Sequence, residues 1–246
     1  MLPALLCRRR RIQMLVIKQG LPEEKISELL AEAERQNIPV QRLSKTEIDA
    51  MAFGKTHGGI LALCAPKSPH SMEELIHHID GVGVPPLLLL LEGVEDSQNL
   101  GYTLRSAEAL GGHALLLKKH LWDFDETAVS RASSGSYERL PIVKIDRAVQ
   151  ELEHLRRKGI KIWGCIANAK RTCYDVDLTT PIVLAIGGEK RGLSAAVREK
   201  CNGFLRIPMS ANSTSLSLSH AASILLAEAM RQRRNKTISA ASNAHE

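Results

Sequence analysis

Aromatic residues are scarce in this sequence, at 3% of 246 residues. Proteins that recognise RNA by stacking bases on aromatic side chains need several exposed rings, so the composition disfavours a protein that works mainly in this way. Long apolar runs are missing too, since the longest, near 87–91, is far too short to span a bilayer. The sequence predicts no membrane-spanning segment and no membrane partner.

Paired cysteines and metal-binding motifs are also absent. The five cysteines are scattered without a C-x-x-C pair, which fits reduced thiols better than a disulfide framework or a zinc site. The nine histidines show no H-E-x-x-H or paired metal spacing. The apolar start is followed rather than preceded by its charges, unlike a secretory signal. We therefore expect no metal and a cytoplasmic protein.

The chain is basic, with a formal net charge of +6. The positive charges cluster at 8–11 and again at Arg231, Arg233, Arg234 and Lys236. Such clusters are either the solvated surface of a soluble domain or a phosphate-attracting surface. Apolar residues make up 44% of the chain, enough to bury a core. The charge permits an RNA partner without establishing one.

Strand and helix patterns alternate along the whole chain. Residues 1–66 form a predicted small domain with strands at 14–18, 38–42 and 59–65 and with helices opened by Pro22 and spanning 46–53. A proline- and glycine-containing linker is predicted over 67–86, around one short helix with a capping box at Ser71 and Glu74. A larger domain is predicted over 87–236, and a flexible tail over 237–246.

The larger domain repeats a strand–helix rhythm. Its predicted strands are 87–92, 113–118, 141–145, 160–166, 181–186 and 204–207, and its predicted helices are 100–110, 125–132, 146–158, 192–201 and 219–234. Alternation of this kind favours an α/β fold with a mostly parallel sheet and helices on both faces.

Three stretches carry residues that suggest chemistry. In the first stretch, 90–111, a predicted buried strand leads through a polar turn into a helix, where Arg105 lies off the apolar stripe. The second stretch, 186–194, is a glycine-rich turn after a strand, typical of a tight turn or a nucleotide loop, without the G-x-G-x-x-G order. The third stretch, 206–219, is rich in serine, and 215–219 alternates like an edge strand.

In this order, the three stretches resemble the motifs of the SpoU (TrmH-like) family of RNA ribose 2′-O-methyltransferases, of the SPOUT class, over 87–234. The resemblance implies a C-terminal trefoil knot, S-adenosylmethionine as cofactor, a structured RNA substrate and a homodimer whose active site takes residues from both subunits. Residues 1–66 are similar to the small RNA-binding domain that precedes many such domains, especially at 54–59. Family members usually begin with a further helix and strand, and the first twenty residues are too short and too basic to supply both. We therefore expect either that this domain is trimmed at its start or that its start is misassigned.

The resemblance also implies a role for individual residues. The implied catalytic residues are Asn99, Arg105, Glu189 and Ser215, and the implied cofactor-binding residues are Gly187, Gly188, Ile207, Pro208, Leu216 and Ser217. A guanidinium is normally protonated and carries only donors, which makes it a demanding general base. We expect Arg105 to hold the phosphate next to the ribose and to stabilise the developing alkoxide, with Asn99 orienting the arginine or the ribose. Glu189 has an alternative role as a helix cap.

One residue departs from the family pattern. Ser217 stands where the family usually has asparagine, and a hydroxyl offers one donor where the amide offers two. An RNA-binding protein of the same fold without useful catalysis is therefore the main alternative. A dinucleotide-dependent oxidoreductase is a third interpretation, which the glycine pattern does not support. The sequence favours ribosomal over transfer RNA and leaves a role in antibiotic resistance open.

Overall fold

The chain divides into two compact units, Met1–Ser68 and Pro69–Glu246. The computed structural model describes residues 2–52, 57–94, 96–118, 121, 123–188, 191–213 and 215–243. The first unit thus ends two residues after the predicted boundary between the small domain and the linker, which is residue 66.

The first unit is a three-stranded sheet with helices. Its strands lie in the order β2-β1-β3, with β1 parallel to β2 and antiparallel to β3. Leu15 and Ile17 of β1 are fully buried and pack against Ile26 and Leu29. The elements described in this unit are α1 (Leu2–Cys7), β1 (Ile12–Lys18), η1 (Glu23–Lys25), α2 (Ser27–Arg35), β2 (Val40–Leu43), α3 (Lys45–Met51) and β3 (Ile60–Cys64).

A helix before the first strand was not predicted. The strand predicted at 14–18 is present as β1, whereas α1 occupies residues that were predicted to be too short and too basic for a further helix and strand. The basic residues are accommodated by a carboxylate, because Glu32 of α2 is 1% exposed and forms ion pairs with Arg8 and Arg35. At least one member of the first basic cluster therefore stabilises the small unit.

The second unit is built on a seven-stranded sheet, as far as the structure describes it. Its order is β6-β5-β4-β9-β7-β10-β8, and every neighbouring pair is parallel. The central strands β4 and β9 are buried along their whole length, which explains their continuous apolar sequences. The strands are β4 (Leu87–Leu91), β5 (Ala114–Lys118), β6 (Ile142–Ile145), β7 (Lys161–Cys165), β8 (Arg171–Thr172), β9 (Ile182–Ile186) and β10 (Gly203–Arg206).

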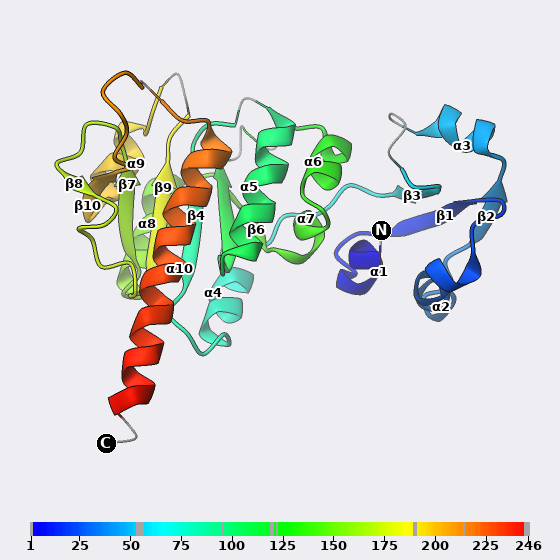
Figure 1. Ribbon diagram of the computed structural model, residues 1–246, viewed down its shortest axis with the longest axis horizontal. Helices are drawn as coiled ribbons and strands as arrows, with labels where there is room; N and C mark the ends of the chain where they lie inside the picture. The colour runs from blue at the N-terminus through cyan, green and yellow to red at the C-terminus, as the bar shows by residue number, and fades with distance from the viewer. Residues whose placement is uncertain are drawn as a thin grey trace. The chain divides into compact units, whose positions relative to one another are not determined.

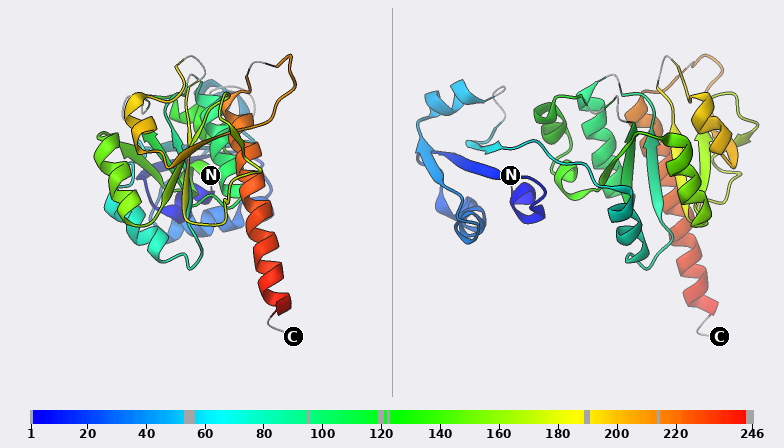
Figure 2. Two further views of the ribbon diagram at one scale, coloured as in Figure 1. Left: turned by 90° about the vertical axis from the view of Figure 1, so that its left-hand side faces the viewer. Right: turned by 180° about the vertical axis from the view of Figure 1, so that it is seen from behind.

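Helices cover both faces of this sheet (Figures 1 and 2). One face packs against α5 (Ser97–Ala109), α6 (Glu126–Ala132), α7 (Ser136–Arg139) and α10 (Leu218–Asn243). The other packs against α4 (Met72–Asp80), α8 (Ala148–Arg157) and α9 (Ala195–Lys200). The predicted α/β architecture with a mostly parallel sheet is confirmed, whereas the trefoil knot stays a prediction.

The stretch predicted as a linker contributes to the core of the second unit. Its helix α4 has the expected capping box, in which Glu74 N donates to Ser71 Oγ and Ser71 N donates to the Glu74 carboxylate. Leu75 and Ile79 of α4 are buried among β4, β5 and α8 residues. Because this apolar stripe needs a partner, the helix folds onto the sheet rather than lying free between domains.

The last helix, α10, continues nine residues beyond the predicted end at 234. Its first half buries Ala222, Leu225 and Leu226 against the sheet. Figure 1 shows its final turns extending past the sheet. The residues predicted as a flexible tail are therefore helical through 243.

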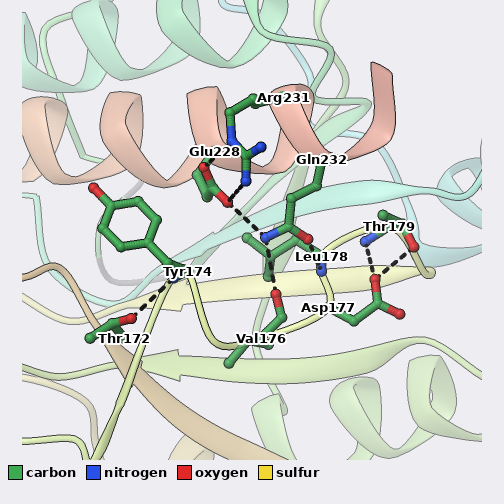
Figure 3. A network of polar contacts seen from close by, with 9 residues as sticks. All are labelled: Thr172, Tyr174, Val176, Asp177, Leu178, Thr179, Glu228, Arg231 and Gln232. Carbon is green, nitrogen blue, oxygen red and sulfur yellow. Dashed lines mark hydrogen bonds and ion pairs between the residues drawn. The ribbon is translucent and has the colours of Figure 1, made fainter. Parts of the chain in front are cut away.

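Polar contacts hold the middle of α10 to the segment that follows β8 (Figure 3). Glu228 is 6% exposed and accepts two hydrogen bonds from Arg231, both at 2.8 Å. Gln232 donates to the Glu228 carboxylate and to Val176 O, and it accepts from Leu178 N at 2.9 Å. Backbone groups of the segment after β8 thus form hydrogen bonds with a side chain of α10 rather than with a neighbouring strand.

Arg233 completes this attachment. Its guanidinium donates to four backbone carbonyls: Leu178 O, Thr180 O, Pro85 O and Pro86 O. Burial lowers the pKa of Arg233. Two of the four residues in the second basic cluster, Arg231 and Arg233, are therefore structural rather than free to attract phosphate.

Candidate active site

The first and second stretches start where two neighbouring strands end. β4 ends at Leu91 and β9 ends at Ile186, and these residues are register partners. The helices that follow lie on opposite faces, since α5 packs on one side of the sheet and α9 on the other. Parallel sheets bind ligands at the carboxyl ends of their strands where the connections diverge in this way.

Glycines allow the two loops to touch. A Cβ on Gly93 would lie 2.3 Å from the Cα of Gly188, and a Cβ on Gly187 would lie 2.1 Å from the carbonyl carbon of Gly192. In both cases the obstacle is backbone, which cannot rotate away. The glycines of the second stretch therefore serve close packing between loops, as well as the cofactor approach that the resemblance implies.

A buried carboxylate fastens the two loops further. Glu92 is 8% exposed and accepts from Ser194 N at 2.6 Å and from Ser194 Oγ at 2.7 Å. Lys118, at the end of β5, forms an ion pair with Glu92 and donates to Ser194 Oγ. Sequence analysis missed this network because its members lie far apart in the chain. The sole signal was a charged residue directly after an apolar strand.

Serine hydroxyls join the first stretch to the third. Ser219 of α10 donates to Asn99 Oδ1 of α5 at 3.1 Å, and Ser223 donates to Ser106 Oγ at 2.8 Å. Because Asn99 accepts through its oxygen, its amide nitrogen keeps both hydrogens available to a ligand. The backbone of Asn99 is fixed as well, since its carbonyl accepts from Thr103 Oγ1 at 2.8 Å.

Arg105 is exposed on α5, whereas Leu104 and Ala107 are buried. Its guanidinium forms no hydrogen bond or ion pair with any residue that the structure describes. Tyr102 is 47% exposed and precedes Arg105 by three positions, which places both on one side of the helix. Sequence analysis did not single out Tyr102.

Residues 215–219 form no strand. Ser215 is exposed, Leu216 and Ser217 are half-buried, and α10 begins at Leu218. The alternative of an edge strand at 215–219 is therefore wrong, because the hydrophobic residues here are taken up by the first turn of a helix.

Ser217 is held by an imidazole. Its Oγ lies 2.5 Å from His220 Nδ1 and 3.4 Å from Ser219 Oγ. Since Ser219 donates to Asn99, a chain of side chains connects exposed His220 to the first stretch. Sequence analysis did not identify His220.

The remaining predicted site residues have mixed environments. Ile207, Gly187 and Gly188 are half-buried, and Pro208 is exposed. Glu189 lies outside the described residues. Its alternative role as a helix cap is filled by Ser194, whose Oγ accepts from Val197 N at the start of α9.

His57, the histidine of the 54–59 segment, has a structural role in the small unit. His57 Nδ1 accepts from Gly59 N at 3.0 Å, and Nε2 lies 2.9 Å from Asp49 Oδ1. Both ring nitrogens are thus engaged within the chain.

The described ranges contain neither a membrane-spanning helix nor a cluster of metal ligands. No helix there is long and apolar enough to cross a bilayer. No group of three or more His, Cys, Asp or Glu side chains gathers there as a metal site would require.

Comparison with known proteins agrees with this arrangement. Residues 86–227 match the SpoU rRNA methylase family, and residues 2–70 match the RNA 2′-O ribose methyltransferase substrate-binding family. The chain belongs to the SpoU rRNA methylase family.

Its relatives resemble it over nearly their whole length. The 23S rRNA (guanosine-2′-O-)-methyltransferase RlmB of Pseudomonas putida is 32% identical over 92% of this chain and 91% of its own. The putative TrmH family tRNA/rRNA methyltransferase YacO of Bacillus subtilis is 29% identical over 91% of this chain and 90% of its own. The SpoU methyltransferase AviRb of Streptomyces viridochromogenes, crystallised with AdoMet, superimposes with a TM-score of 0.78 at 26% identity, covering 95% of this chain and 88% of AviRb.

Proposed function

We propose that this SpoU family member methylates a ribose 2′-oxygen of ribosomal RNA with S-adenosylmethionine. The observation that carries the proposal is the joining of the three stretches at one edge of the sheet, through the Gly93–Gly188 approach and the Ser219–Asn99 hydrogen bond. Relatives that are 32–33% identical are named 23S rRNA guanosine-2′-O-methyltransferases, which favours this RNA over transfer RNA.

The predicted cofactor residues suit an adenosyl group. Ile207 and Leu216 offer half-buried apolar side chains, and Gly187 and Gly188 offer backbone without a Cβ. Gly187 and Ile207 follow strands β9 and β10, which are separated by β7 alone. When bound, S-adenosylmethionine supplies a methyl group on a positively charged sulfur. We assign Gly187, Gly188, Ile207, Pro208, Leu216 and Ser217 to its binding.

The chain's own residues would act on the ribose and its phosphate. The 2′-oxygen bonds to the methyl carbon as the bond from that carbon to sulfur breaks, and its proton is released to solvent. Loss of the proton leaves negative charge on the oxygen as the transition state is approached. Arg105, which has no partner among the described residues, is positioned to hold the neighbouring phosphate and to stabilise that charge. The free amide hydrogens of Asn99 orient the ribose. Glu189 and Ser215 remain catalytic candidates by resemblance.

The assembly is also part of the proposal. We propose a cytoplasmic homodimer in which the small unit binds RNA, with a trefoil knot in the larger unit and no metal. The apolar residues Ala222, Leu225 and Leu226 of α10 give little support for a dimer, because they are buried within the chain. Ala221 and Ile224 are half-exposed and are the apolar residues in this part of α10 that could contact a second subunit. The dimer therefore rests on family membership.

A direct assay tests the function. The purified protein is incubated with a 23S rRNA transcript and S-adenosylmethionine carrying a tritiated methyl group, and the product is mapped by resistance of one phosphodiester bond to alkaline hydrolysis. We expect label at one ribose. Label on a base, or none on ribosomal RNA but label on transfer RNA, would overturn the respective part of the proposal.

A second candidate is an RNA-binding protein without catalysis. The observation that favours it is Ser217, whose hydroxyl is engaged by His220 where the family usually has an amide. Isothermal titration with S-adenosylmethionine separates the two candidates. Binding of the cofactor supports the enzyme, and its absence together with retained RNA affinity supports the binding protein.

A further inference from the structure

A cavity of about 490 Å³ lies at the β10 side of the large sheet. It is lined by residues of β7, β8, β10, α9 and the segments after β7 and α9, and none of them belongs to the three stretches. The loop is fixed to β10, because Ile166 N donates to Leu205 O and Arg206 Nε donates to Ala169 O. The cavity is large enough for a small ligand.

Two aromatic residues line this cavity in a chain that has few. The chain contains two Trp, three Tyr and three Phe, and both Trp163 and Phe204 line this one site. Each ring lies across a glycine of the neighbouring strand, since Trp163 is the register partner of Gly203 and Phe204 that of Gly164. A Cβ on either glycine would come within 2.6 Å of the ring. The rings are thus held in place by the sheet.

The charge of the cavity is positive. Lys170, Arg171 and Arg198 line it, and no aspartate or glutamate does. None of the three cations forms an ion pair with a described residue, in contrast to Arg231. The guanidinium of Arg198 lies over the Phe204 ring, 4.9 Å from its centroid. A guanidinium supported in this way can stack on a base, and the other two cations can hold phosphate.

We propose that this cavity binds one unpaired nucleotide of the RNA substrate, outside the site of methyl transfer. The base would stack on the guanidinium of Arg198, supported by Phe204, and the phosphate would contact Lys170 and Arg171. This inference rests on the proposed function for the identity of the RNA. It assigns a specificity role to residues outside the three stretches.

The first test compares two arginine-to-alanine substitutions, each of which removes one positive charge. Arg198→Ala should weaken RNA binding about tenfold, as expected for the loss of one stacked base. Arg157→Ala is the matched control, because Arg157 lies on α8 with a 78% exposed side chain. Affinity for a 23S rRNA fragment is measured by fluorescence anisotropy at fixed salt. Equal affinities of the two variants would overturn the proposal.

A second variant tests the phosphate contacts. Lys170→Ala combined with Arg171→Ala should make the salt dependence of RNA binding shallower by about 0.7 in slope for each lost contact. S-adenosylmethionine should still raise the melting temperature of every variant by the wild-type amount. Loss of that shift in Arg198→Ala would mean that the cavity serves the cofactor, and would overturn the proposal.

Failure of the proposed function gives a different result. If the wild-type protein binds RNA but methylates none, the proposed reaction is wrong. The anisotropy comparison then still tests whether the cavity binds a nucleotide. If it methylates RNA and the cavity variants keep wild-type affinity and salt slope, the cavity assignment alone is wrong.

Discussion

The two halves of α10 are attached to the rest of the protein by different chemistry. Near its start, single hydroxyl contacts connect Ser219 and Ser223 to Asn99 and Ser106 of α5. Further along, the charged Arg233 guanidinium donates to four backbone carbonyls outside the helix. Gln232, which donates to Glu228 of the same helix, also bonds to Val176 and Leu178. Charge-assisted hydrogen bonds are about twice as strong as neutral ones. The half of α10 at the site thus combines weak polar contacts with the apolar packing of Ala222, Leu225 and Leu226, whereas the half away from the site makes strong polar contacts.

This difference separates activity from stability. Substitutions in or next to the site half should change methyl transfer and leave the melting temperature nearly unchanged. Substitutions in the half with strong polar contacts should lower the melting temperature and leave methyl transfer nearly unchanged. Each of the following predictions tests one side of that contrast.

The largest expected effect is that of Arg105→Ala. If Arg105 holds phosphate and stabilises the alkoxide, kcat/KM should fall about a thousandfold or more, corresponding to roughly 4 kcal/mol of transition-state stabilisation. Arg105→Lys should not restore the rate, because an ammonium cannot reproduce the bidentate guanidinium contact. Single-turnover methyl transfer and cofactor affinity are measured together.

Cofactor affinity and melting temperature serve as the controls for Arg105, and both should match the wild-type values. Near-normal transfer by either variant would contradict the assignment.

Arg233→Ala should give the largest loss of stability. Removing its guanidinium leaves backbone carbonyls of the 178–180 and 85–86 segments without their donor, which should cost about 2–4 kcal/mol. Urea unfolding measures the change. Arg234→Ala is the matched control, because Arg234 is exposed, and its unfolding free energy should stay within about 0.5 kcal/mol of wild type.

The contrast would fail if Arg233→Ala lost transfer activity at a temperature where it remained fully folded. It would also fail if the two arginine variants were equally stable.

Ser217→Asn restores the residue usual in the family. If the serine merely substitutes for the amide, the change should tighten cofactor binding by about 0.5–1.5 kcal/mol, the value of one good hydrogen bond. If the loop has instead repacked around Ser217 and His220, the larger side chain should reduce stability by roughly 1–3 kcal/mol. Melts with and without S-adenosylmethionine distinguish the two outcomes. No change in either melt would mean that position 217 faces away from the cofactor.

The smallest expected effect concerns pH. Hydrogen bonds from Arg231 hold the pKa of Glu228 below its ordinary value. A lowered carboxyl pKa stabilises the fold above the ordinary pKa, and this contribution is lost as the pH falls through the folded-state value. Glu228→Gln should therefore show a weaker loss of stability on acidification, with a difference at neutral pH of about 0.5–1 kcal/mol.

Urea unfolding at neutral pH and near pH 4 checks this prediction. Parallel pH dependences of the wild type and the variant would show that Glu228 does not contribute to acid sensitivity.

Sequence patterns predicted the strands of the large unit well because each strand is a short apolar run bounded by turns. They missed β8, Arg171–Thr172, because two residues carry no periodicity. They also missed α7, which begins after Gly135 in a left-handed conformation and has four residues. The extension of α10 was missed because its alanine- and serine-rich sequence has no apolar stripe to distinguish it from a tail.

The site was less accessible to sequence analysis than the fold. Asn99 and Arg105 came from a family resemblance, while the bond from Ser219 to Asn99 joins helices more than a hundred residues apart. Nothing local in the sequence marks Glu92 as the partner of Lys118 and Ser194. Likewise, Arg233 looks like one more charge in a basic cluster until its four carbonyl acceptors are seen.

The contact between Gly93 and Gly188 has a mechanical consequence. With a Cβ excluded at 2.3 Å, the loops after β4 and β9 are already at their closest approach. Backbone against backbone resists compression steeply but offers little resistance to separation. The two glycines therefore prevent the loops from moving closer together, and the hydrogen bonds from Ser194 to Glu92 keep them from moving apart.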